Sequence, residues 1–236
     1  MYTTDHFAKQ FSLASRILGI LFPALDAECM FKVTLNTHYM CNNCQFHGDK
    51  PYSLNHIPLH VNSPNQTSVG SMLYDFQLSE NLDTDYACDN CHCKGSTTKT
   101  DLRTSTSQIF ILTLKAFQFD LATLSASKKN SLLLLKMNLN VNGKWRLIGV
   151  VLHEGAATNT GHYSAVVNTG TGKQCNWFSL NDTIATPCSA PTHFLVTDDS
   201  LPYIIFYEKV DEPETSLSQE HRRKAFSRIE TIRNNH

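Results

Sequence analysis

The sequence has few charged side chains and no surplus of either sign. Charged residues make up 17% of 236 residues, and the formal net charge is −1, whereas globular proteins usually contain about 25% charged residues. A protein that binds nucleic acid by neutralising phosphates needs a surplus of Lys and Arg. The composition therefore argues against a nucleic-acid partner, and no block of like charge indicates an interaction arm.

Long hydrophobic runs are also missing. The most apolar segment, 17–22, lies between Arg16 and Pro23 and is far shorter than the roughly 20 residues that a membrane-spanning helix needs. It also lacks the basic leader and the small-residue cleavage pattern of a signal peptide. We therefore expect no membrane partner and a cytoplasmic or nuclear location, where thiols stay reduced.

The first half of the chain shows both helical and strand-like patterns. Apolar residues at helical spacing predict a helix over 5–25. A turn is expected at 62–66, and a Ser-rich exposed connection at 121–130. Strands are expected at 31–35, 52–61, 72–78 and 109–114. With 41% hydrophobic residues, the chain is long enough to build one sizeable domain or two small ones.

Residues 132–182 predict a four-stranded antiparallel meander. Strands at 132–141 and 144–153 flank Asn142-Gly143, a strong signal for a tight hairpin. A second hairpin turns near Thr171, so the numbers of paired residues sum to about 342, and His162 lies beside Leu180 and Asn181. A last strand is expected at 203–207.

The predicted neighbours His162 and Asn181 carry the chemistry of the second hairpin. A histidine beside a carboxamide supplies a general base and the group that orients it, which are two members of a nucleophilic triad. A pair of this kind also occurs as a plain structural hydrogen bond. The hairpin by itself leaves both interpretations open.

Four of the eight cysteines form two Cys-x-x-Cys pairs, Cys41 with Cys44 and Cys88 with Cys91. The two-residue gap lets both thiolates of a pair face one ion, and two pairs complete a tetrahedral zinc site. Disulfides are disfavoured without a secretory signal, and a redox-active Cys-x-x-Cys usually occurs singly. The spacing therefore predicts a structural zinc ion held by these four thiols.

Several segments together resemble the ubiquitin-specific proteases. Gly161-His162-Tyr163 follows Leu152-His153-Glu154-Gly155, and 177–182 and 203–208 come after it, in the order of that family's histidine box. The two cysteine pairs resemble the zinc-bearing fingers of the same family. The resemblance implies an α+β, papain-like cysteine peptidase fold with an antiparallel β palm and zinc-bound β fingers, in which the helical lobe is largely missing.

The resemblance also implies domains and roles. It divides the chain into a helical remnant of the thumb lobe at 1–30, fingers and palm at 31–210, and a charged tail at 211–236. The implied catalytic residues are the general base His162, the third triad member Asn181 and the neighbouring acid Asp182. Gly161 and Tyr163 would line the channel for the ubiquitin C-terminus. Ubiquitin and ubiquitinated proteins are the implied partners, with structural zinc as the cofactor.

The family's nucleophile box, of the type Gly-Asn-x-Cys, is not found in the sequence. Cys29 lies among acidic residues that disfavour a thiolate. Cys93 lies beside the second cysteine pair, and Cys175 and Cys188 are expected to be packed. We therefore expect a deubiquitinase domain whose nucleophile is not in this chain, or an inactive relative that only binds ubiquitin, and no activity of the chain alone.

Overall fold

The computed structural model describes residues 30–61, 66–82, 84–106, 108–115, 117–120, 125–128, 131–155, 161–170, 175–196 and 200–210. Residues Phe31–Val210 form one compact unit. The expected helix at 5–25, the tail at 211–236 and, apart from Met30, the segment 1–30 lie outside the described residues, as does the turn at 62–66 apart from Gln66. No helix in the described part is long and apolar enough to cross a membrane.

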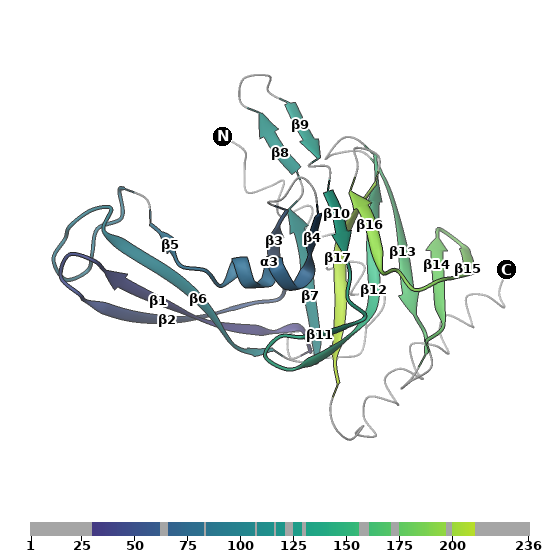
Figure 1. Ribbon diagram of the computed structural model, residues 1–236, viewed down its shortest axis with the longest axis horizontal. Coiled ribbons are helices and arrows are strands. Elements are labelled where there is room, and N and C mark those ends of the chain that lie inside the picture. Colours follow the sequence, from purple (N-terminus) through teal and green to yellow (C-terminus); the bar gives the residue numbers. More distant parts are fainter. Residues whose placement is uncertain are drawn as a thin grey trace. The chain divides into compact units, whose positions relative to one another are not determined.

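One sheet, here called the small sheet, has the strand order β2-β1-β6-β5 (Figure 1). Its strands are β1 (Val33–Cys41), β2 (His47–Leu54), β5 (Glu80–Asn81) and β6 (Thr97–Thr106). β1 is the centre of this sheet and pairs antiparallel with β2 on one side and with β6 on the other. Figure 1 shows that these three strands are long and extend away from the other sheets of the unit.

The large sheet has eight strands in the order β15-β14-β13-β12-β17-β7-β3, with β11 also paired to β12. Its strands are β3 (Ile57–His60), β7 (Ile109–Lys115), β11 (Asn138–Asn140), β12 (Lys144–Glu154), β13 (His162–Asn168), β14 (Trp177–Asn181), β15 (Ile184–Cys188) and β17 (Ser200–Lys209). Within the described part of this sheet, only β3 and β7 pair in parallel. The expected strands at 109–114 and 203–207 are thus confirmed as β7 and part of β17.

Two further sheets complete the described part. A three-stranded sheet has the order β16-β10-β4, and β8 pairs with β9. The strands are β4 (Gln66–Ser68), β8 (Phe117–Asp120), β9 (Ser125–Lys128), β10 (Ser131–Leu134) and β16 (His193–Val196). The expected Ser-rich connection at 121–130 contains β9, which pairs with β8 as a short hairpin.

The expected strand at 72–78 is wrong, because most of it belongs to helix α3 (Val69–Phe76). Ser68 caps this helix: its Oγ accepts a hydrogen bond from the Ser71 backbone N–H, while the Ser71 Oγ accepts one from the Ser68 backbone N–H. Such a reciprocal pair satisfies two otherwise unpaired donors at a helix start. Met72 and Leu73 are buried three and four residues after buried Val69, which is helical spacing.

The expected meander over 132–182 is only partly correct. Asn142-Gly143 does turn β11 back onto β12, and β12, β13 and β14 follow as antiparallel neighbours. Residues 132–141, however, do not form one strand. β10 lies in the three-stranded sheet, parallel to β4 and antiparallel to β16, and only β11 joins the large sheet. A continuous apolar run is typical of a buried strand but does not reveal its partners.

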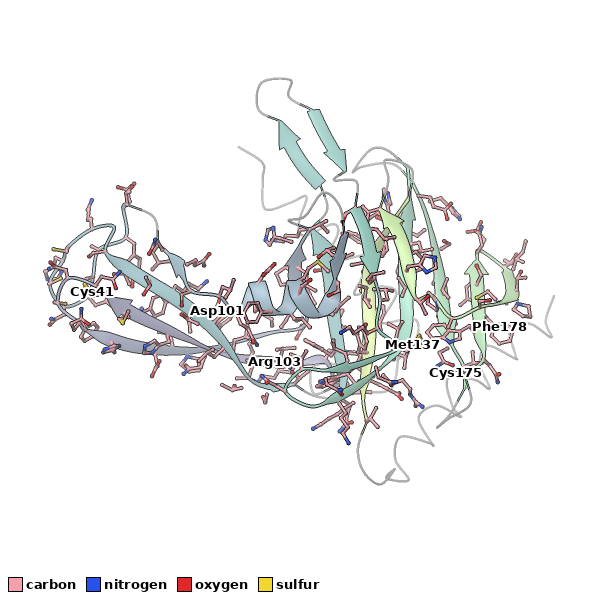
Figure 2. The ribbon with its side chains drawn as sticks, viewed as in Figure 1. Cys41, Asp101, Arg103, Met137, Cys175 and Phe178 are labelled. Carbon is pink, nitrogen blue, oxygen red and sulfur yellow. The ribbon has the colours of Figure 1, made fainter. Side chains whose placement is uncertain are left out.

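A buried arginine joins the small sheet to the core. The Arg103 guanidinium, on β6, lies 4.5 Å from the centroid of the Phe110 ring and donates to the carbonyl oxygen of Val141. Trp145 Nε1 donates to the same carbonyl at 3.1 Å. Burial lowers the pKa of Arg103 to about 10, so the guanidinium keeps its charge at neutral pH. Arg103 therefore fixes the inner end of β6 against the β11–β12 turn (Figure 2).

We predict that Ser68→Ala lowers the free energy of unfolding by about 1 kcal/mol, because the first turn of α3 loses its capping acceptor. Urea denaturation followed by circular dichroism measures the change. Tyr74→Ala, at a position on the same helix that is 68% exposed, is the matched control and should have little effect. A loss in Tyr74→Ala equal to that in Ser68→Ala would contradict the role of the cap.

Candidate functional site

The structure brings His162 and Asn181 into contact. His162 is the first residue of β13, Asn181 is the last of β14, and His162 Nε2 lies 2.6 Å from Asn181 Oδ1. Because a carboxamide oxygen can only accept a hydrogen bond, Nε2 carries the hydrogen and the neutral ring keeps its lone pair on Nδ1. The pair therefore fixes one tautomer of the imidazole and leaves Nδ1 available as a base.

The hairpin that forms this pair has a register different from the expected one. Ala165 faces Leu180 and Asn168 faces Trp177, so the numbers of paired residues sum to 345 and not to about 342. The Asn168 side chain holds the two ends of this loop together, because its Oδ1 accepts from the backbone N–H of Gly170 at 2.9 Å and of Asn176 at 3.1 Å. In this register His162 and Asn181 are diagonal neighbours on one face of the sheet, and the imidazole and the carboxamide meet across that diagonal.

Asp182 lies in the turn that ends β14. Asn181 faces Ile184 across β14 and β15, so only Asp182 and Thr183 make the connection. Asp182 has a φ of 50°, which Asp and Asn adopt more readily than other non-glycine residues. This tight turn fixes the end of the strand that carries Asn181. The implied role of Asp182 as an acid stays a prediction.

Gly161 lies directly before His162, where no side chain fits. A Cβ at this position would overlap Nε2 of His153 and lie 2.5 Å from the carbonyl oxygen of Glu154. Neighbouring backbone and a buried ring therefore exclude every residue with a Cβ from this position. The close approach holds the entry to β13 against the end of β12, so Gly161 positions His162 through the backbone.

Tyr163 belongs to an aromatic cluster on the face of the sheet opposite to His162, because successive residues of a strand point to opposite faces. The centroid of its ring lies 4.9 Å from that of His153 and 6.0 Å from that of Tyr203. Burial raises the pKa of Tyr163. Burial and the neighbouring Tyr163 raise the pKa of Tyr203 to about 12, so both phenols stay protonated at neutral pH. Contact between Tyr163 and a substrate stays a prediction.

The sequence interpretation assigns no role to His153 and Glu154, which lie next to the pair. Glu154 faces His162 across β12 and β13, and its Oε1 accepts a hydrogen bond from Ser164 Oγ at 3.1 Å. His153 is only 3% exposed and lies under Gly161. The sequence could have identified His153 and Glu154 as neighbours of His162. The strand that ends before Gly155 pairs antiparallel with the strand that begins after Gly161.

The four paired cysteines lie together at the outer end of the small sheet, where Figure 2 labels Cys41. The sulfur atoms of Cys41, Cys44, Cys88 and Cys91, here called the thiol cluster, all lie within 4.8 Å of one another. The Cys41 and Cys91 sulfurs are 3.7 Å apart, and those of Cys44 and Cys88 are 3.8 Å apart. With a Zn–S distance of 2.3 Å, the corners of a tetrahedron are about 3.8 Å apart. The four thiols could therefore bind a metal ion.

Hydrogen bonds adjust the acidity of these thiols. The backbone N–H of Cys44 donates to the sulfur of Cys41 and lowers the pKa of that thiol to about 6. At Cys88 the backbone N–H groups of Cys91 and Asn90 lower the pKa of the thiol. Burial and the hydrogen bonds to Cys41 and Cys44 act in the opposite direction, and together they raise the pKa of Cys88 to about 11. Metal binding requires thiolates and would release the remaining protons.

The other described cysteines lie away from His162. Cys93 accepts a hydrogen bond from the Asn43 side chain at 3.2 Å, beside the thiol cluster. Cys175 and Cys188 are exposed, so the expectation that they are packed is wrong: β15 is an edge strand and is exposed throughout. Cys188 faces Trp177, at the opposite end of β14 from Asn181, which is a separation of about 13 Å at 3.3 Å per residue.

The model of the ubiquitin carboxyl-terminal hydrolase family matches residues 26–207 of this chain. The mouse protein ubiquitin carboxyl-terminal hydrolase 17-like protein D is 30% identical over 186 residues, which are 75% of this chain and 32% of the mouse protein. Ubiquitin carboxyl-terminal hydrolase 9 of Saccharomyces cerevisiae is 22% identical over 205 residues, 81% of this chain and 27% of the yeast protein. The chain thus spans about a third of the length of these relatives.

Solved structures show the same fold. The SAGA Ubp8/Sgf11/Sus1/Sgf73 DUB module bound to ubiquitin aldehyde contains a chain that superposes with a TM-score of 0.66 at 19% identity, covering 89% of this chain and 50% of that chain. The module bound to monoubiquitin gives a TM-score of 0.65 at 21% identity, covering 87% of this chain and 48% of that chain. The described sheets therefore correspond to about half of such a chain.

We predict that Gly161→Ala destabilises the protein by about 1–3 kcal/mol, because the added methyl group would force apart β12 and the entry to β13. Urea denaturation measures the loss. Gly48→Ala is the control, since a Cβ there would meet only Phe46 at 3.8 Å, an ordinary contact distance. Equal stability of Gly161→Ala and the unchanged protein would show that the backbone can relax at this position.

Proposed function

Because the chain belongs to the ubiquitin carboxyl-terminal hydrolase family, we propose that it carries the histidine half of a cysteine-dependent deubiquitinase site. The supporting observation is the hydrogen bond of 2.6 Å between His162 and Asn181. Both residues are at strand ends, where a ligand can reach them. In this proposal the large sheet is the palm of a papain-like fold, and the small sheet is the fingers.

In the proposed reaction, a cysteine thiol gives its proton to Nδ1 of His162, and the thiolate attacks the carbonyl carbon of the C-terminal glycine of ubiquitin. The protonated imidazole then returns the proton to the leaving amine, and water releases the ubiquitin carboxylate and restores the thiol. Asn181 would keep Nε2 protonated throughout, so that Nδ1 always faces the reacting atoms.

The thiol would come from a segment outside the described residues. No cysteine of the described part is placed beside His162, since the described cysteines lie in or beside the thiol cluster or at the opposite end of β14. The relatives are about three times as long as the matched part. We propose that the nucleophile box belongs to the part of such a protein that the described residues do not include.

The small sheet would hold ubiquitin, with zinc as its structural cofactor. The thiol cluster joins the β1–β2 turn to the segment before β6, so one ion would tie the outer ends of three strands together. A reducing compartment such as the cytoplasm or nucleus would keep the thiols available to the ion. Ubiquitin and ubiquitinated proteins are the proposed partners, since solved relatives are bound to ubiquitin aldehyde and monoubiquitin.

A second candidate function is ubiquitin binding without hydrolysis on the same scaffold. It is favoured by the absence of a cysteine beside His162 in the described part of the chain. The two candidates agree on the partner and differ only in whether a thiol reaches Nδ1 of His162. An experiment must therefore measure binding and thiol chemistry separately.

We predict that the purified chain holds one zinc ion per molecule and that Cys88→Ser loses it. Structural zinc contributes about 10–16 kcal/mol of apparent binding free energy in small domains, so a chelator should unfold the small sheet. Metal content by mass spectrometry and the loss of near-ultraviolet circular dichroism measure the two effects. Cys93→Ser removes a neighbouring thiol outside the tetrahedron and should keep the ion; loss of zinc in this control would contradict the ligand set.

We predict that the chain binds ubiquitin and shows no turnover of a fluorogenic ubiquitin amide by itself. Chemical-shift changes in labelled ubiquitin measure binding. In the full-length protein that contains this chain, ubiquitin with a C-terminal electrophile should label the nucleophile, and His162→Ala should slow labelling by about 10²–10⁴, the usual contribution of a general base. His193→Ala, at an exposed histidine on β16, is the control.

The outcomes separate the candidates. Absence of any shift in labelled ubiquitin would overturn both. Binding with no labelling of the full-length protein would favour the non-catalytic module. Labelling that His162→Ala leaves unchanged would overturn the assignment of the base, whatever the binding result.

A further inference from the structure

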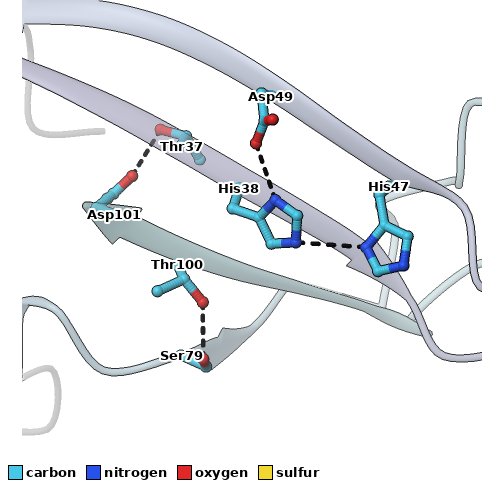
Figure 3. A network of polar contacts seen from close by, with 7 residues as sticks. All are labelled: Thr37, His38, His47, Asp49, Ser79, Thr100 and Asp101. Carbon is cyan, nitrogen blue, oxygen red and sulfur yellow. Dashed lines mark hydrogen bonds and ion pairs between the residues drawn. The ribbon is translucent and has the colours of Figure 1, made fainter. Parts of the chain in front are cut away.

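Two histidines and an aspartate form a row on the small sheet (Figure 3), and none of them belongs to the group of four thiols. His38 Nε2 lies 3.4 Å from His47 Nδ1. The centroids of the two rings are 5.4 Å apart, and the ring planes differ by 25°. On the other side of the His38 ring, Nδ1 lies 2.8 Å from Oδ1 of Asp49. The two histidines therefore present ring nitrogens to each other, and the Asp49 carboxylate is hydrogen-bonded to the other ring nitrogen of His38.

The register of β1 and β2 produces this arrangement. His38 faces Asp49 and Met40 faces His47, so His38 and His47 are diagonal neighbours on one face of the hairpin. That face is open to solvent: the side chains of His38 and Asp49 are 38% and 59% exposed. A hydrated ion can therefore reach the two nitrogens without any rearrangement of the strands.

The two nitrogens are close enough for a long hydrogen bond, and their separation also matches that of two ligands on one metal ion. A Zn–N distance of 2.0–2.1 Å places two nitrogens at the corners of a tetrahedron about 3.4 Å apart. A hydrogen bond from a ring N–H is usually shorter, with a donor–acceptor distance of about 2.7–3.2 Å. The observed separation of 3.4 Å thus equals the distance between two nitrogen ligands of a tetrahedral zinc ion. In the same way, the sulfur separations of 3.7 and 3.8 Å in the thiol cluster match the distance between two sulfur ligands.

Asp49 orients the His38 ring, as a carboxylate beside a metal-binding histidine commonly does. Its carboxylate can only accept, so His38 Nδ1 carries the hydrogen and Nε2 keeps the lone pair that faces His47. Ligating histidines almost always donate their other N–H in this way, which fixes the ring and raises its basicity. Imidazole ligands suit zinc, copper and nickel.

Other side chains near the pair are already engaged. Thr100 faces His38 from β6, and its hydroxyl lies 2.7 Å from that of Ser79. The carboxylate of Asp101 accepts from the Thr37 hydroxyl at 2.6 Å on the opposite, buried side of the sheet. Figure 3 shows these two contacts beside the histidine row. An ion at the histidines would therefore have two protein ligands and complete its shell with water.

We propose that His38 and His47 bind a divalent transition-metal ion, with geometry matched to Zn²⁺, as a second and weaker metal site on the face of the small sheet. The two imidazoles supply Nε2 and Nδ1, and Asp49 orients His38. This site rests on the β1–β2 hairpin alone and does not depend on the proposed deubiquitinase function.

Zinc titration by isothermal calorimetry tests the proposal. The chain is first loaded with zinc and dialysed, and every variant carries Cys93→Ser so that this neighbouring thiol cannot bind the added metal. We expect one further equivalent of Zn²⁺ to bind. His38→Gln and His47→Gln should each abolish it, and Asp49→Asn should weaken it by about 10–100-fold, the usual cost of removing a group that orients a ligand.

His193→Gln is the matched control, because it removes an exposed histidine on β16 and should leave the second equivalent unchanged. Circular dichroism before titration verifies that each variant is folded. No second equivalent at millimolar zinc would overturn the proposal, and so would a second equivalent that survives in both His38→Gln and His47→Gln. An unchanged affinity in Asp49→Asn would overturn the role of the carboxylate.

Discussion

The antiparallel register of β12, β13 and β14 is the constraint on which the candidate site depends. His162 and Asn181 lie on different strands and meet only because Ala165 pairs with Leu180. A slip by one residue would turn every side chain of a strand to the other face and separate the imidazole from the carboxamide. Three local features hold the register: Gly161 at the entry to β13, Asn168 in the loop and Asp182 in the turn after β14.

The sequence predicted those parts of the structure that local chemistry decides. The spacing of the cysteine pairs brought four sulfurs together, and Asn142-Gly143 turned the chain where expected. The contact between His162 and Asn181 was predicted correctly from a register that was wrong, because diagonal neighbours on one face of a sheet can also touch. Strand partners were not predictable: β10 pairs with β4 and β16 from distant parts of the chain. The helix α3 was missed because alternation at 72–78 hid the cap at Ser68.

In the small sheet, the single strand β6 connects the thiol cluster to the core. β6 begins at Thr97, which faces Cys41 of the thiol cluster, and it carries Arg103 into the core beside Phe110. Asp101 and Arg103 lie on its buried face. The Asp101 carboxylate forms an ion pair with Lys99 at 2.9 Å and accepts a hydrogen bond from the Thr37 hydroxyl, and the Arg103 guanidinium donates to the Val141 carbonyl. Because partners on both neighbouring elements fix these groups, a metal ion at the outer end would act on a sheet whose inner end is already anchored.

The position of His162 does not depend on the proposed nucleophile. Every described contact that orients His162 comes from β12 to β15, and the aromatic cluster of His153, Tyr163 and Tyr203 supports the same strands from the opposite face. A scaffold of this kind would present Nδ1 in the same place with or without a thiol beside it. Pre-organised groups are the part of a catalytic site that costs no reorganisation during reaction, so the approach of the thiol alone would decide between an enzyme and a ubiquitin-binding module.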